Sequence, residues 1–254
     1  MTPLVVGNWK MHGGPTACME LARAIVGGRR KERISAEVVL APPFTGLAPV
    51  KKTIGKNPVK LAAQNCHWQN SGAFTGEISP AMLAQIGCNF VIIGHSERRH
   101  LFGEDDKAVA QKLPAVIRHG MRPILCVGET LEERQSNRTR AVIAHQLDSA
   151  LKGLAEGDIE KVEIAYEPVW AIGTGLNASA EQIRDAHGQI RERLIALAGA
   201  AKSEQVRILY GGSVKPDNAD MIAGIDAVNG VLVGGASLMA ESFLKIAQSF
   251  SRSR

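Results

Sequence analysis

The sequence predicts an α/β fold, a single (β/α)8 barrel that spans residues 1–254. Eight short apolar runs recur along the chain, and most are separated by longer stretches with helical spacing. The length of 254 residues suits one closed barrel of eight such units. No linker, low-complexity segment or change of composition divides the chain.

The predicted strands are continuous apolar runs rather than alternating ones. Burial on both faces requires this pattern, and it is typical of parallel sheets covered by helices. In chain order, the runs comprise residues 4–9, 38–41, 59–63, 90–93, 124–127, 162–166, 206–210 and 230–233.

Several predicted helices carry start signals. Ser79 precedes Pro80, whose fixed φ suits a first helical turn. Ser179 and Gln182 fit a capping box, and apolar residues follow on one stripe. Further helices are expected from the Lys215–Asp217 stretch and from Ser237 onward.

Composition and charge distribution exclude some classes of binding partner. The net charge of +5 suits anionic partners, but basic and acidic residues are interleaved and no aromatic-studded basic stretch occurs. We therefore expect no nucleic-acid binding and interpret the surplus charge as a solvated surface that mildly attracts an anionic substrate. No apolar run approaches the about 20 residues of a membrane helix, so no membrane association is expected.

The N-terminus and the cysteines point to the cytoplasm. The chain enters its first strand without a basic, apolar leader. The four cysteines form no C-x-x-C pair, which favours free thiols in a reducing cytosol and argues against a metal site.

Chemistry in such barrels lies at the carboxyl ends of the strands. The first strand leads to Asn8 and Lys10, the fourth to His95, and the sixth to Glu167. A carboxylate close to apolar residues beneath a covering loop loses water and becomes more basic, so Glu167 is the candidate base. His95 is a second candidate catalytic group, and Lys10 is an electrostatic clamp or a Schiff-base nucleophile.

Glycine pairs come directly after the last two strands. Gly211-Gly212-Ser213 and Gly234-Gly235 lie where barrels commonly hold a phosphate, because backbone N–H groups can approach an anion there. They could also simply form tight turns, but two adjacent pairs together with Ser213 favour a phosphate site.

Other polar residues remain ambiguous. Glu97 and Arg99 belong either to the site or to a structural ion pair, and His67, His100 and His187 are interpreted as structural. Residues 173–178 match G-x-G-x-x-A, yet the match neither follows its strand at once nor opens a helix. We interpret it as a loop.

Six motifs occur together in one order. They are Gly7-Asn8-Trp9-Lys10-Met11, Gly72-Ala73-Phe74-Thr75-Gly76-Glu77, Ile93-Gly94-His95-Ser96-Glu97-Arg98-Arg99, Tyr166-Glu167-Pro168-Val169-Trp170-Ala171-Ile172-Gly173-Thr174-Gly175, Tyr210-Gly211-Gly212-Ser213-Val214 and Leu232-Val233-Gly234-Gly235-Ala236-Ser237. With them the chain resembles the triose-phosphate isomerase family nearly from end to end. The resemblance implies a TIM barrel that interconverts dihydroxyacetone phosphate and D-glyceraldehyde 3-phosphate in glycolysis and gluconeogenesis.

The resemblance also assigns roles. Glu167 corresponds to the base that moves a carbon-bound proton. His95 corresponds to the electrophile that polarises the carbonyl and shuttles protons between the oxygens of the enediolate. Lys10 and Asn8 correspond to residues that hold the substrate. The backbone phosphate grip would comprise Gly173, Ser213, Gly234 and Gly235. No metal or organic cofactor is implied.

The resemblance further implies a homodimer through the long loop from Asn65 to Ile78, with Thr75 near the neighbouring site. Trp68 and Phe74 on that loop favour burial against a partner. Leu176 and Asn177 stand where the family often has lysine and threonine, which bears on the kinetics of a lid spanning residues 168–178.

Two alternatives remain open on the residues alone. One is a barrel aldolase that uses Lys10 as a Schiff base. The other is a catalytically silent anion-binding protein.

Overall fold

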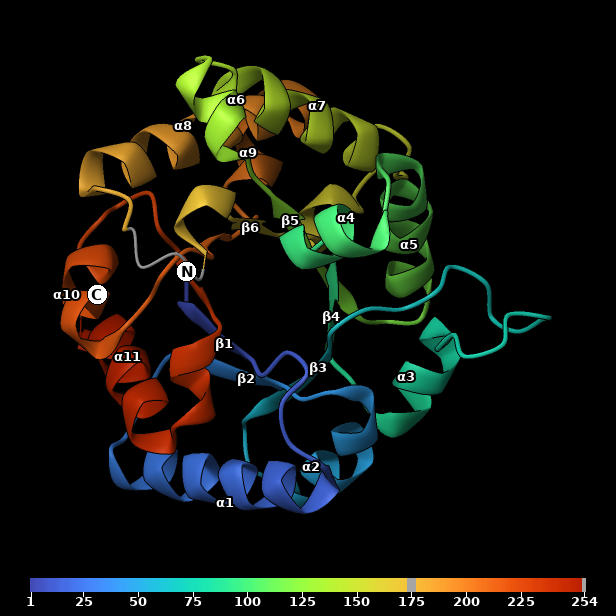
Figure 1. Cartoon of the computed structure of the whole chain (residues 1–254), viewed down its shortest axis with the longest axis vertical. Coiled ribbons are helices and arrows are strands. Elements are labelled where there is room, and N and C mark those ends of the chain that lie inside the picture. The colour runs from blue at the N-terminus through green and yellow to red at the C-terminus, as the bar shows by residue number, and fades with distance from the viewer. Residues whose placement is uncertain (173–176, 253–254) are drawn as a thin grey trace.

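The computed structural model describes residues 1–172 and 177–252. Its eight strands form a closed barrel in the order β1 to β8, and every neighbouring pair is parallel. Figure 1 shows the strands at the centre, surrounded by the helices. The predicted fold class is confirmed.

The strands match the predicted runs within one or two residues at each end. They are β1 (Leu4–Asn8), β2 (Glu37–Ala41), β3 (Lys60–Ala63), β4 (Phe90–Ile93), β5 (Arg122–Val127), β6 (Glu163–Tyr166), β7 (Ile208–Tyr210) and β8 (Gly230–Val233). The predicted run of residues 124–127 begins two residues after β5 does, because the strand starts with the less apolar residues Arg122 and Pro123. A proline is tolerated there because the beginning of a strand can spare an N–H group.

Helices follow the strands around the ring. The α-helices are α1 (Pro15–Lys31), α2 (Leu47–Ile54), α3 (Pro80–Ile86), α4 (Ser96–Phe102), α5 (Asp106–Arg118), α6 (Leu131–Gln135), α7 (Thr139–Leu151), α8 (Ala180–Ala198), α9 (Ala200–Ser203), α10 (Pro216–Ala223) and α11 (Ala240–Arg252). The described residues also form four short 3-10 helices: η1 (Phe44–Gly46), η2 (Ile159–Lys161), η3 (Val169–Ala171) and η4 (Gly235–Leu238).

The helix starts predicted at Ser79 and Ser179 are confirmed, and the one predicted at Ser237 is wrong. Ser79 accepts a hydrogen bond from Met82 N–H, and Ser179 forms its capping box with Gln182. The stretch from Ser237 does not begin the last helix directly. It first forms η4, and α11 starts at Ala240, because η4 closes a tight turn after β8 in which Ser237 N–H donates to the Gly234 carbonyl.

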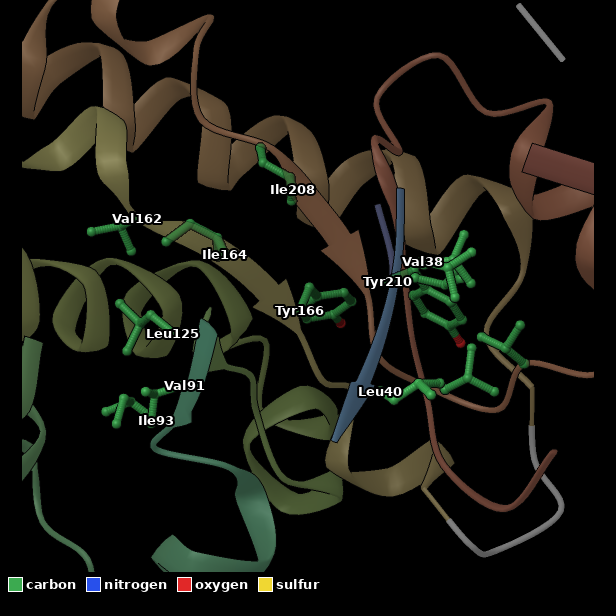
Figure 2. Packing of buried hydrophobic residues seen from close by; sticks show 14 of the residues in the cluster. Val38, Leu40, Val91, Ile93, Leu125, Val162, Ile164, Tyr166, Ile208 and Tyr210 are labelled. Atoms are coloured by element: carbon green, nitrogen blue, oxygen red, sulfur yellow. The ribbon is translucent and has the colours of Figure 1, made fainter. Parts of the chain in front are cut away.

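The strands are buried on both faces, as predicted. Alternate side chains fill the barrel interior, including Leu4, Val6 and Ala165. The side chains between them pack outward against the helices, including Ile164 and Tyr166. Figure 2 shows these outward-facing residues on β6 and the adjacent β7. All four cysteines are free and buried.

Candidate active site

Four predicted site residues from the first, fourth and sixth strands meet at one end of the barrel. Asn8, Lys10, His95 and Glu167 line a single cavity of about 600 Å³. Ser213, Gly234 and Gly235 line the same cavity from the turns after β7 and β8. Gly173, the remaining predicted residue, lies outside the described residues.

Glu167 follows β6 directly, and its carboxylate is buried and bound at both oxygens. Oε1 lies 2.9 Å from Nε2 of His95. Oε2 accepts a 2.8 Å hydrogen bond from the backbone N–H of Ser96, the first residue of α4. Burial raises the pKa of Glu167, but the His95 ring and the Ser96 amide outweigh burial and lower it. The expectation that burial makes Glu167 more basic is therefore wrong for the free protein, in which the carboxylate is held in its ionised form.

His95 is the N-cap of α4, and this position determines which ring nitrogen carries hydrogen. Nδ1 accepts a 3.3 Å hydrogen bond from Glu97 N–H. An accepting nitrogen carries no proton, so in the neutral ring the hydrogen sits on Nε2, which faces Glu167. Burial lowers the pKa of His95, while the charge and hydrogen bond of Glu167 outweigh burial and raise it.

Lys10 is held in an uncommon backbone conformation, with φ of 52°. A left-handed lysine carries strain that its surroundings must hold in place. Its N–H donates to Asn8 Oδ1 at 3.0 Å, and its carbonyl accepts from Gln64 Nε2 at 2.8 Å. The ammonium forms an ion pair of 2.5 Å with Glu97. The cation is thus positioned at the edge of the cavity.

Glu97 and Arg99, the two ambiguous residues, have different surroundings. Glu97 contacts Lys10 and lies 3.6 Å from Nδ1 of His95. Arg99 instead donates to the Gly94 carbonyl and pairs with Asp106 at 2.6 Å. Arg99 therefore braces the turn after β4.

The glycines after β7 allow a close approach of backbone to the carboxylate. A Cβ at Gly211 would lie 3.0 Å from Cγ of Glu167, and one at Gly212 would lie 2.2 Å from the Tyr210 hydroxyl oxygen. A side chain at either position would displace its neighbour. These glycines therefore do more than form a turn.

Sequence reasoning missed two polar residues at the ends of strands. Gln64 comes directly after β3 and braces Lys10. Glu129 lies just beyond β5, fully buried, and accepts hydrogen bonds from Tyr166 and Trp170 at 3.0 to 3.1 Å. The rule that places chemistry at the carboxyl ends of strands would have found both residues, had it been applied to the third and fifth strands.

Among residues 1–172 and 177–252, no group of three or more His, Cys, Asp or Glu side chains is arranged to hold a metal ion. Over the same ranges, none of the helices is long and apolar enough to span a membrane.

Comparison with known proteins gives one consistent result. The family model described as triosephosphate isomerase matches residues 3–250. The triosephosphate isomerase of Syntrophotalea carbinolica is 47% identical over 247 residues, covering 96% of each chain. That of Chlorobium phaeovibrioides is 48% identical over 246 residues, covering 97% of this chain and 98% of its own. A crystal structure of triosephosphate isomerase from Bartonella henselae superposes with a TM-score of 0.89 at 40% identity, covering 98% of this chain and 99% of that one.

Proposed function

This chain belongs to the triosephosphate isomerase family, and from the geometry of its cavity we propose how its residues divide the isomerase reaction. Its activity is the interconversion of dihydroxyacetone phosphate and D-glyceraldehyde 3-phosphate, an aldose–ketose isomerisation. The proposal rests on one observation: a buried carboxylate, an imidazole and an ammonium line the same cavity as the glycine turns.

Glu167 is the proposed base. It removes a proton from the carbon next to the carbonyl and returns it to the neighbouring carbon, so no net proton is gained or lost. Its pKa is lowered in the free enzyme, which keeps the carboxylate ready to accept. Since its oxygens are bound by His95 and Ser96, the carboxylate must leave these partners as the substrate enters.

His95 is the proposed electrophile. In the free protein Nε2–H faces the Glu167 carboxylate. When substrate is bound, Nε2–H can instead donate to the substrate carbonyl, whose oxygen gains negative charge as the proton leaves the neighbouring carbon. Once Glu167 has turned away, its charge and hydrogen bond no longer raise the pKa of the ring, and burial lowers that pKa against the smaller effect of Glu97. A neutral imidazole then gives its Nε2 proton to the developing oxyanion and takes up the proton of the neighbouring hydroxyl, so that carbonyl and hydroxyl exchange places and the ring ends unchanged.

Lys10 and Asn8 are proposed to bind the substrate and to offset its negative charge. The turns at Ser213, Gly234 and Gly235 are proposed to bind the phosphate, together with Gly173. In support, the backbone N–H groups of Ser213 and Gly234 donate to no turn or loop carbonyl in the part of the chain that is described. Free N–H donors beside open cavity space are suited to phosphate oxygens.

Two substitutions test the catalytic roles. Glu167→Asp shortens the base, and His95→Gln removes the ring, so each should lower kcat by about a hundredfold or more in a coupled spectrophotometric assay. Glu181→Asp, at an exposed position on α8, is the matched control. Near-normal turnover with a native circular dichroism spectrum would remove the roles assigned to Glu167 and His95.

We also propose that residues 1–254 act as one catalytic domain in the cytoplasm, without metal or organic cofactor. Four free, buried thiols support a reducing compartment. The proposed proton transfers use only side chains that line the cavity. Exhaustive dialysis against a chelator should therefore leave kcat unchanged, and restoration of lost activity by a divalent metal would contradict this.

The loop between β3 and α3 supports a homodimer. It projects away from the barrel (Figure 1), and Phe74 near its tip remains 43% exposed. A second cavity of about 390 Å³ lies beside the active site, and Lys10, His95 and Phe102 line it. We propose that the loop of a second copy enters this cavity, because Phe102 and Met11 there are 71% and 93% exposed.

Thr75→Arg, at the exposed tip of the loop, tests the dimer. Burying a guanidinium without a partner should shift the protein to monomers in sedimentation velocity and lower kcat, since Lys10 and His95 line the docking cavity. Ile195→Arg, at an exposed position on α8, is the control and should remain dimeric. A dimeric, fully active Thr75→Arg protein would contradict the proposed interface.

A further inference from the structure

A concentration of positive charge lies away from the active site. Arg29, Arg30, Arg33 and Lys56 line a hollow of about 530 Å³ together with Asn57 and Ile34; we call it the basic hollow. It lies between the end of α1 and the segment that joins α2 to β3. Because α1 runs back from the carboxyl end of β1, the hollow lies at the amino ends of the strands, on the face opposite the catalytic cavity.

Among residues 1–172 and 177–252, no acidic side chain lines the basic hollow. None of its four cations forms an ion pair with a carboxylate in the described parts of the chain. Glu32 is the acidic residue within the basic run, and it neither pairs with these cations nor lines the hollow. No direct ion pair therefore offsets the electrostatic repulsion among these four neighbouring cations.

Two unused hydrogen-bond donors accompany the charge. Nε of Arg29 is buried and has no hydrogen-bond partner among the described residues. Asn57 uses its side-chain oxygen to accept from Val59 N–H, which leaves the amide nitrogen as a donor at the hollow. The Asn57 amide can donate directly to an anionic oxygen in the hollow, whereas the Arg29 side chain must shift before its buried Nε can do the same.

Helix stability explains only part of this arrangement. Arg29 and Arg30 lie in the last turn of α1, where cations interact favourably with the helix dipole. Arg33 and Lys56 lie outside the helices, so that argument does not cover them. The φ of 54° at Arg33 belongs to the end of α1: Arg33 follows the C-cap Glu32, and Ile34 N–H donates to the Arg29 carbonyl.

We propose that the basic hollow binds a small polyanion carrying two or three consecutive phosphate groups. Three guanidinium groups can each bind two phosphate oxygens, and the hollow has the volume of a small-ligand site. None of the described residues that line it is aromatic, so they provide no stacking surface of the kind that single-stranded nucleic acid requires. The ligand is therefore recognised through its phosphates, and the hollow lies apart from the isomerase cavity.

Isothermal titration of the intact protein with inorganic tripolyphosphate tests the proposal. Saturating triose phosphate is kept present, because the catalytic cavity itself accepts phosphate. We expect one site per chain, and affinity should fall about tenfold or more in Arg30→Gln/Arg33→Asn. Asparagine tolerates the left-handed backbone at position 33, so the fold should persist.

Arg118→Gln/Arg184→Gln is the matched control. Both residues are exposed, Arg118 lies in the last turn of α5, and the change in net charge is identical. The control should bind tripolyphosphate as the parent protein does, and both double variants should retain isomerase activity.

Three results would overturn the proposal: absence of binding with triose phosphate present, equal weakening in the two double variants, or tighter binding of a short oligouridylate than of tripolyphosphate. Because the isomerase assay is run on the same samples, failure of this proposal is separate from failure of the catalytic assignment.

Discussion

At the scale of single residues, Glu167 and His95 set each other's protonation. Burial favours the neutral form of both, yet each is shifted toward its charged form because the other lies 2.9 Å away. The pair is therefore a coupled unit, and removing one partner should change the titration of the other.

The first prediction concerns the acid side of the pH profile of kcat/KM. In His95→Gln the imidazole no longer lowers the pKa of Glu167, so this pKa should be higher in the variant than in the parent. A raised pKa means that the carboxylate is protonated at a higher pH, so activity should be lost earlier as pH falls. The residual kcat/KM of the variant is measured against pH beside the parent; coincident acid limbs would contradict the coupling. Titration of the substrate phosphate is common to both profiles.

The second prediction concerns Gly211. In Gly211→Ala the new Cβ would lie 3.0 Å from Cγ of Glu167 and 3.2 Å from the Tyr166 carbonyl, so the carboxylate must move. We expect kcat to fall about tenfold to a hundredfold. Gly188→Ala, in α8 with open space around the position, should retain kcat and gain slightly in stability. Steady-state kinetics measure kcat and thermal melts measure stability for both variants. An unchanged kcat in Gly211→Ala would contradict the prediction.

At the scale of elements, Glu129 ties three segments together at the start of the loop beyond β6. Its carboxylate accepts from Tyr166 on β6, Trp170 on η3 and Arg134 on α6. The Arg134 guanidinium also lies 4.8 Å from the centre of a Trp170 ring. This arrangement fixes where η3 leaves the barrel.

The third prediction is that Glu129→Gln loosens η3. The amide keeps the shape but loses the negative charge that pairs with Arg134, and the buried hydrogen bonds to Tyr166 and Trp170 weaken. We expect a loss of about 1–3 kcal/mol in the free energy of unfolding and a higher KM. Urea denaturation, Trp fluorescence and kinetics measure these effects. An unchanged KM together with unchanged stability would show that Glu129 does not hold η3 in place.

At the scale of the whole molecule, buried polar groups make stability depend on pH. His187 on α8 is fully buried, with Nδ1 3.0 Å from the Ala227 carbonyl and its ring edge-on to Tyr166. Burial lowers the pKa of His187 from 6.5 to about 4. The native protein therefore keeps this ring neutral where the unfolded chain would protonate it.

The fourth prediction follows from that difference. Between pH 6.5 and about 4 the unfolded state binds a proton that the native state does not, so stability should fall as pH falls through this window. The contribution is on the order of 3 kcal/mol. His187→Gln removes this titration and should flatten the decline between these pH values. Urea midpoints measured at intervals across the window test it, and parallel curves for the two proteins would contradict it.

The architecture of the barrel is encoded locally in the sequence. Continuous apolar runs, capping residues such as Ser79 and Ser179, and glycines after strands are local signals, because each depends on neighbours within a few residues. The rule that chemistry lies at the strand ends then singled out Asn8, Lys10, His95 and Glu167 before any contact was known.

The way those residues meet depends on the packing of the whole chain. Closure of the barrel brings positions 8, 95, 167 and 234 to one cavity, although they are far apart in the chain. The Ser96 amide on Glu167, the Gln64 brace on Lys10 and the Glu129 junction depend on side-chain distances across strands, which periodicity does not encode. The basic hollow could not be predicted from the sequence for the same reason. Lys56 lies beside the arginines of α1 only because α1 packs against α2. From the sequence alone, these cations were therefore interpreted as part of a solvated surface.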